Sequence, residues 1–300
     1  MRGKLYRRDP VKILISAGAA VIVMIYVSLL RVNGGLLYRR LLFTENSVFG
    51  LVLAVISALL FSLAASRLNQ GEEQIRNYEK SNKMMLELVV LLLLMFPGTG
   101  LGMRLLTNLG VPESIPFFMS GISYCFIPVF YTVNIKKRKI SELGFADHKY
   151  IFEDFKVALI VAFLSIMIID PVNVTMERIA GLQKPSSEVS GFPLFVLPLV
   201  FAFHGVGMIQ NIAWNGLIQR KIEDRYNWSQ RGFIISFLIM AFLLQAYFEP
   251  KANLQALVAH APGNTIGLLI MCYLFHKTKR IYTPAFWHWF TNFIGMIPYT

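Results

Sequence analysis

Long apolar runs separated by short polar breaks dominate the chain. A helix needs about 20 mostly apolar residues to cross the hydrocarbon of a bilayer, and runs of this kind recur from one end of the chain to the other. The pattern therefore predicts an all-α, polytopic membrane helical bundle of eight or nine transmembrane helices. The number stays open because the fifth run is short and the eighth is interrupted by Pro262-Gly263-Asn264. The nine runs cover residues 13–30, 48–65, 84–103, 115–133, 157–171, 192–216, 232–248, 257–275 and 281–297.

Composition and charge support this interpretation. Hydrophobic residues make up 55% of the chain and charged residues 15%, which is more apolar than a soluble core of this size requires. The first run follows a basic segment and has no small-residue cleavage site, so we interpret it as a retained helix with a cytoplasmic N-terminus. Most of the 29 Lys and Arg residues then fall on the cytoplasmic side. Topology and anionic lipid thus explain the net charge of +12, and no nucleic-acid partner is expected.

The polar breaks divide the chain into three parts. The largest break, "NIKKRKISELGFADHKYIFEDFK", begins with basic residues and continues with aromatic and acidic ones at helical spacing. We therefore expect N-terminal transmembrane helices over 1–135, a cytoplasmic interfacial loop over 136–156 and a C-terminal transmembrane core over 157–300. No segment is large enough to form a soluble catalytic domain, so any chemistry must come from residues within or beside the membrane.

Polar residues at membrane depth gather on two of the predicted helices. Such residues are costly in hydrocarbon and normally face the bundle interior. Asn211 and His288 lie at similar distances from the interfacial Arg220 and Arg280, about 12 to 14 Å at the rise of an α-helix. The two polar ridges should therefore lie at the same level. One ridge carries His204, Asn211, Asn215 and Gln219, and the other carries His288 and Asn292 at i and i+4.

Packing of the two helices would form one buried cluster of Asn211, Asn215, His288 and Asn292. Trp214, Trp287 and Trp289 flank it and are candidates for contact with a partner. The cluster supplies one imidazole and several amides, which provide neither a general base nor three metal ligands, so no metal or cofactor is expected. Simple hydrogen bonding between helices is the alternative. The other ionisable candidates at helix depth or helix ends are Glu87, Asp170, Glu249, His260 and His276, which the spacing does not bring to the cluster, and Cys125 and Cys272 are interpreted as buried thiols.

The C-terminal half, roughly 140–297, resembles the CPBP (CAAX protease, Abi) family of bacterial intramembrane proteases. That family carries a His-x-x-x-Asn motif, which is present here as His288 and Asn292 after "KTKRIYTPAFWHWFTN". The phrase "ISELGF" is also similar. The family's Glu-Glu-x-x-Phe-Arg-Gly motif is represented by "QNIAWNG", in which Gln210 and Asn211 replace both glutamates and Asn215 replaces the arginine.

A further family motif, Phe-x-x-x-His, has no counterpart, because no histidine occurs between Lys221 and Ala259. Its place falls near 244–249, where Phe248 or Glu249 is available. In the family the glutamates and histidines are thought to activate water or bind a metal. The resemblance therefore implies a retained fold with remnant motif positions in place of a catalytic set.

The resemblance leads us to expect a catalytically inactive protein of the bacterial cell membrane that regulates or scaffolds another membrane protein, such as a cell-wall hydrolase or a sensor kinase. One alternative is an active intramembrane protease, metal- or glutamate-dependent, that uses His288 with Glu249 or Glu87 in a rearranged site. Bacteriocin self-immunity and small-molecule transport are further alternatives.

Overall fold

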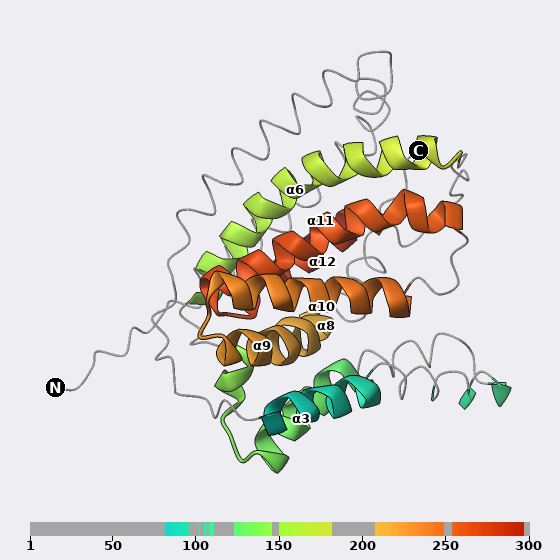
Figure 1. Cartoon of the computed structure of the whole chain (residues 1–300). Coiled ribbons are helices and arrows are strands. Elements are labelled where there is room, and N and C mark those ends of the chain that lie inside the picture. The colour runs from blue at the N-terminus through green and yellow to red at the C-terminus, as the bar shows by residue number, and fades with distance from the viewer. Residues whose placement is uncertain are drawn as a thin grey trace.

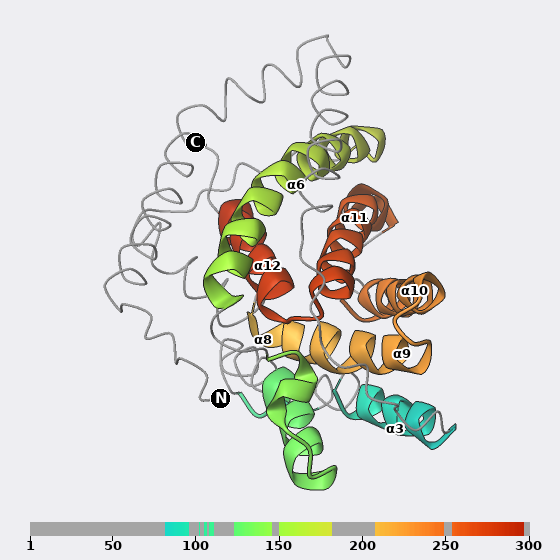
Figure 2. The same cartoon turned by 90° about the vertical axis from the view of Figure 1, so that its left-hand side faces the viewer.

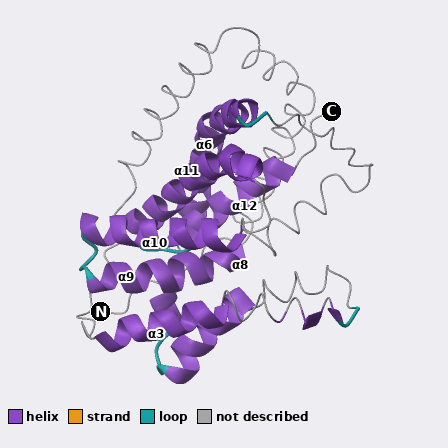
Figure 3. Cartoon of the chain, turned by 45° about the vertical axis from the view of Figure 1, so that its right-hand side comes forward, coloured by secondary structure: helices purple, strands orange, loops and turns teal. Residues whose placement is uncertain are grey.

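All described parts of the chain are helical. The computed structural model describes residues 82–95, 102, 105–106, 108–110, 123–145, 150–181, 208–248 and 254–296. These ranges contain helices and turns and no strand, so the predicted all-α class is confirmed for them (Figure 3). Across the same ranges, no helix combines the length and the apolar character that a membrane crossing demands. The predicted runs 13–30 and 48–65 lie outside the described residues.

Three helices form the centre of the C-terminal part. The long α6 (Ile151–Ile179) packs along both α11 (Leu254–Thr278) and α12 (Tyr282–Met296), and α10 (Gln230–Phe248) packs against α11 (Figures 1 and 2). Pro262 lies inside α11, so the predicted interruption at Pro262-Gly263-Asn264 is wrong. A proline is tolerated within a helix where neighbouring segments and local adjustment satisfy the freed backbone groups.

One rod of three successive segments carries the remnant first motif. It consists of α8 (Met208–Asn211), the π-helix η6 (Ile212–Gln219) and α9 (Arg220–Arg225). Its α8 end packs against α12 and its α9 end against α10. Every residue of η6 is buried. Because π-helical turns are rare and occur frequently at functional sites, the position of η6 on the "IAWNGLIQ" stretch directs attention to this rod.

Two shorter helical segments pack beside α9. They are α3 (Asn82–Leu93) and a helix over 123–130 that continues as the π-helix η2 (Tyr131–Ile135) (Figure 1). A basic turn over 136–139 then leads to the short 3₁₀-helix η3 (Ile140–Leu143), which contacts η6.

Gly216 allows three chain segments to meet. A Cβ atom at Gly216 would lie 2.6 Å from the carbonyl oxygen of Leu143 and 3.3 Å from the side chain of Ile281. Gly144, at a φ of 88°, accepts a backbone hydrogen bond from the Ile281 nitrogen at 2.9 Å. The glycine of the remnant motif is therefore required by packing, because only a residue without a side chain fits between this carbonyl and the next helix.

A buried ion pair fixes the start of α6 to the turn before α12. Arg280 donates to both carboxylate oxygens of Asp154, with Nε 2.8 Å from Oδ2 and 3.2 Å from Oδ1. Asp154 is almost fully buried, and the Arg280 guanidinium also lies over the Tyr150 ring. Loss of one partner from a buried pair of this kind costs about 3–5 kcal/mol, since the other charge is left without compensation.

We expect Gly216→Ala to lower the free energy of unfolding by about 1–3 kcal/mol, because the new methyl group overlaps a backbone oxygen that cannot move independently. Gly267→Ala is the matched control. Its Cβ would meet Trp287 and Ile169 at ordinary contact distances of 3.5 and 3.7 Å. Unfolding of both variants in mixed micelles tests this, and equal stability of the two would contradict the close-packing role of Gly216.

Candidate functional site

The two predicted polar ridges meet at Asn211 and His288. Asn211 ends α8 and is fully buried, while His288 lies in the middle of α12. The Asn211 Nδ2 atom lies 3.0 Å from His288 Nδ1. Since an amide nitrogen can only donate, His288 Nδ1 is the acceptor in this contact. The similar depths of the two residues along their helices predicted this contact.

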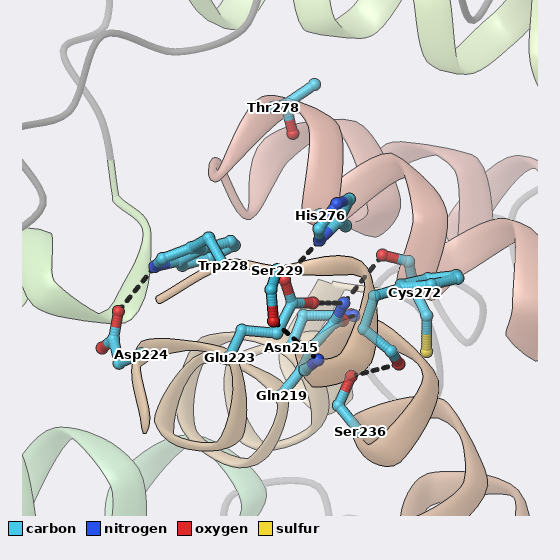
Figure 4. A network of polar contacts seen from close by, with 12 residues as sticks. Asn215, Gln219, Glu223, Asp224, Trp228, Ser229, Ser236, Cys272, His276 and Thr278 are labelled. Atoms are coloured by element: carbon cyan, nitrogen blue, oxygen red, sulfur yellow. Dashed lines mark hydrogen bonds and ion pairs between the residues drawn. The ribbon is translucent and has the colours of Figure 1, made fainter. Parts of the chain in front are cut away.

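Asn215 takes part in a different set of contacts. Its Nδ2 donates to Gln219 Oε1 at 2.6 Å, and Gln219 Nε2 donates to Glu223 Oε1 at 2.5 Å and to the Cys272 carbonyl at 2.8 Å (Figure 4). The three side chains are fully buried and spaced four residues apart. The structure therefore divides the predicted cluster, with Asn211 directed to α12 and Asn215 directed along its own rod toward α11.

The chain of hydrogen bonds ends in a buried carboxylate and a partly exposed imidazole that the sequence reasoning missed. Glu223 Oε2 pairs with His276 Nδ1 from the last turn of α11 (Figure 4). Phe233 and Trp228 lie beside the imidazole, with ring centroids 5.1 and 6.3 Å away. His276 thus stays apart from Asn211 and His288, as the spacing predicts, but it pairs with a carboxylate at the far end of the same rod. One more step of four residues beyond Gln219 would have found Glu223, whereas only tertiary packing brings His276 to it.

The remaining predicted site residues occupy less connected positions. Gln210 is half-buried, and Asn292 is half-buried with an Nδ2 atom that has no hydrogen-bond partner among the described residues. Trp214 and Trp287 are each only 3% exposed, and the Trp287 indole donates to Ser165 Oγ at 2.9 Å. Trp289 is half-buried. His204, Glu249 and the side chains of Asp170 and His260 lie outside the described residues.

The chemistry available at Asn211 and His288 is hydrogen bonding. No carboxylate pairs with His288 in the part of the chain that the structure describes, and no group of three His, Cys, Asp or Glu side chains there could hold a metal ion. Glu223 follows Asn211 by more than three helical turns, which corresponds to about 18 Å along the rod at the rise of an α-helix. Among the described residues, the side chain that hydrogen-bonds to the His288 ring is the Asn211 amide.

A second polar cluster joins α3, η2 and α9. Glu87 accepts from Tyr131 Oη and from Lys136 Nζ, each at 2.5 Å, so this predicted ionisable candidate is used in an ion pair. Lys221 Nζ donates to Tyr131 Oη at 3.2 Å and lies 4.8 Å from the centre of the same ring. Burial lowers the pKa of Lys221 to about 8, an effect that Glu87 partly opposes and that the nearby cations Lys136 and Arg138 reinforce.

Comparison with known proteins bears on the C-terminal part of the chain. Residues 192–294 match the family model described as type II CAAX prenyl endopeptidase Rce1-like. The matched residues contain both the rod of α8, η6 and α9 and the His288 helix α12, and they support the predicted membership in the CAAX-protease (CPBP, Abi) family. Proteins of this family are membrane proteins, which supports a membrane location for the chain. No curated protein and no solved structure matches the chain.

The depressed pKa of Lys221 predicts a pH dependence of stability. Between about pH 8 and the ordinary lysine pKa, the folded state has released a proton that the unfolded state still binds. The free energy of unfolding should therefore rise with pH over this interval. Lys221→Met should flatten the rise, and Lys156→Met, at an exposed lysine of α6, should leave it unchanged. Unfolding midpoints measured from pH 7 to 10 test this, and an unchanged slope in Lys221→Met would contradict it.

Proposed function

We propose that this chain, through residues 192–294 a relative of the CAAX prenyl endopeptidases, is a catalytically inactive multi-pass protein of the bacterial cell membrane that regulates or scaffolds another membrane protein. In this proposal the N-terminus is cytoplasmic, and the partner is a membrane protein such as a cell-wall hydrolase or a sensor kinase. The place where a protease would hold its substrate serves to bind a helix of the partner.

The contact between Asn211 and His288 carries the proposal. The family motif has a glutamate where this chain has Asn211, and a glutamate at this position could take a proton from water. An amide cannot. The amide donates to His288 at 3.0 Å and occupies the ring nitrogen that a catalytic partner would use. The contact therefore keeps the two helices together while supplying no base.

Neutral amides are suited to recognition within a membrane. A buried carboxylate and its cationic partner would have to be desolvated, whereas an amide makes comparable hydrogen bonds without that cost. Asn292 lies one turn from His288 and has an amide nitrogen that makes no hydrogen bond within the described residues. Trp289 is partly exposed beside it. A partner helix could pack against Trp289, whereas the Asn292 Nδ2 atom itself is buried.

Site-specific photocrosslinking in membranes tests this proposal. A photoreactive phenylalanine analogue at Trp289 should capture one membrane protein in stoichiometric amount. The same analogue at Phe242, an exposed residue of α10, is the positional control. Recovery of the chain alone after crosslinking would contradict partner binding.

An active protease with a rearranged site is the second candidate, and the Glu223–His276 pair favours it. A carboxylate bound to an imidazole can in principle deliver a general base. Here both carboxylate oxygens already accept hydrogen bonds, from Gln219 and at His276, and the carboxylate is fully buried. The pair is therefore better suited to holding α9 against α11 than to activating water.

Variants at the two histidines separate the candidates. If the chain is inactive, His288→Ala should leave the set of membrane-protein fragments in cells unchanged, and His276→Gln should change only stability. Quantitative mass spectrometry of membrane peptides in both variants and in a deletion strain provides the measurement. A fragment that disappears in the deletion strain and in either variant, while the variant protein remains folded, would establish proteolysis and overturn the proposal.

A further inference from the structure

An apolar groove runs beside the helix over 123–135. It has a volume of about 360 Å³, and all but one of its lining residues are apolar. Ile209 of α8 forms the opposite wall, so the groove lies between this helix and the rod that carries the remnant motif. The lining residues are Cys125, Phe126, Val129, Phe130, Asn134 and Ile209.

The helix that forms this groove also exposes apolar side chains. Phe126 and Ile135 are each 59% exposed, and the Phe126 and Phe130 rings stack with centroids 5.4 Å apart. On a helix within a membrane, exposed apolar side chains of this kind are available to lipid acyl chains. Ten residues separate Phe126 from the first basic residue, Lys136, which corresponds to about 15 Å of helix. This length is about half of the 30 Å hydrocarbon thickness, and one lipid acyl chain occupies that half.

The cytoplasmic end of the same helix carries excess positive charge. Three cations of this region have carboxylate partners: Lys136 pairs with Glu87, Arg138 with Glu142 at 3.4 Å, and Arg220 with Asp224 at 3.8 Å. Lys137 and Lys139 are exposed, and neither has a carboxylate partner within the described part of the chain. Lys137 has a φ of 53°, so the chain turns at this point and the basic run ends the helix.

Lys221 adds a buried cation behind this run. It is 8% exposed and its ammonium group donates to a neutral tyrosine hydroxyl, while Glu87 is already held by Tyr131 and Lys136. Burial is the main cause of the lowered pKa of Lys221, and the nearby cations Lys136 and Arg138 lower it further against the opposing effect of Glu87 and Asp224. An anionic group bound at the basic run would offset the excess positive charge.

We propose that one anionic phospholipid of the cytoplasmic leaflet binds here, with an acyl chain in the groove of Phe126, Val129 and Phe130 and its phosphate at Lys137 and Lys139. Charge complementarity selects the headgroup, since the cytoplasmic leaflet is rich in anionic lipid and each basic residue near its surface contributes about 1 kcal/mol. The proposal rests on the membrane location within the proposed function and is independent of catalytic inactivity. The bound lipid would cover the side of the helix that faces Ile209.

Lipid retention measured on the full chain tests the site. The protein is purified in detergent and exposed to phosphatidylglycerol or phosphatidylcholine, and bound lipid is counted by native mass spectrometry. One phosphatidylglycerol per chain should be retained in preference to phosphatidylcholine. The double variant Lys137→Gln with Lys139→Gln should weaken phosphatidylglycerol binding roughly 30-fold, because each lysine contributes about 1 kcal/mol. Lys156→Gln with Arg231→Gln removes the same charge at exposed residues of α6 and α10 and should have no effect.

A probe inside the groove distinguishes the lipid from other anions. Cys125 lines the groove and Cys272 is fully buried, so maleimide alkylation reports on Cys125. Phosphatidylglycerol should slow this alkylation, whereas glycerol phosphate should not. Val129→Trp fills the groove and should therefore reduce lipid retention. The double lysine variant should remain folded.

Several outcomes would overturn the proposal. They are equal retention of both lipids, unchanged binding in the double lysine variant, competition by glycerol phosphate at equal affinity, or capture of an acidic polypeptide at Lys137 in place of lipid. Failure of the lipid site would leave crosslinking at Trp289 unaffected, and loss of partner capture would leave lipid retention unaffected, so the two proposals fail separately.

Discussion

The meeting of three chain segments at Gly216 is the constraint on which the described structure depends. The Leu143 carbonyl presses against the η6 rod at its single residue without a side chain, and Gly144 bonds to Ile281 just before α12 begins. A loop from the middle of the chain thereby fixes the distance between the two helices that carry the remnant motifs. The Asp154–Arg280 pair adds α6 to the same junction. The packing of these segments therefore sets the positions of the residues that form the candidate site.

The polar residues along the rod form two separate sets of contacts. At the α8 end, Asn211 is directed to His288 and the contact is neutral. From Asn215 onward, buried hydrogen bonds lead through Gln219 to Glu223 and His276, and so connect the rod to α11. A buried polar network is stabilising to the extent that its members are satisfied, and here the Asn215 Oδ1 atom has no hydrogen-bond partner within the described residues. At the first end the sequence has amides, and at the other it places the Glu223 carboxylate beside the His276 imidazole.

The second cluster attaches the segments before residue 136 to this core. Tyr131 bridges Glu87 of α3 and Lys221 of α9 with a single hydroxyl group, which accepts from the lysine and donates to the carboxylate. The basic residues 136–139 follow in this region, and the apolar groove lies along the same helix. Apolar surface and positive charge thus meet where the helix ends, an arrangement that matches the amphipathic structure of a phospholipid.

The sequence by itself determined the all-α class, the family resemblance and the matched levels of Asn211 and His288, because apolar run length, motif spacing and helical rise are local properties of the chain. It could not show that α11 continues through Pro262 or that Asn215 is directed away from His288. Only the tertiary structure brought His276 to Glu223, Lys221 to Tyr131 and the Leu143 carbonyl to Gly216. These contacts join residues between 53 and 90 positions apart, and the packing of whole helices decides them.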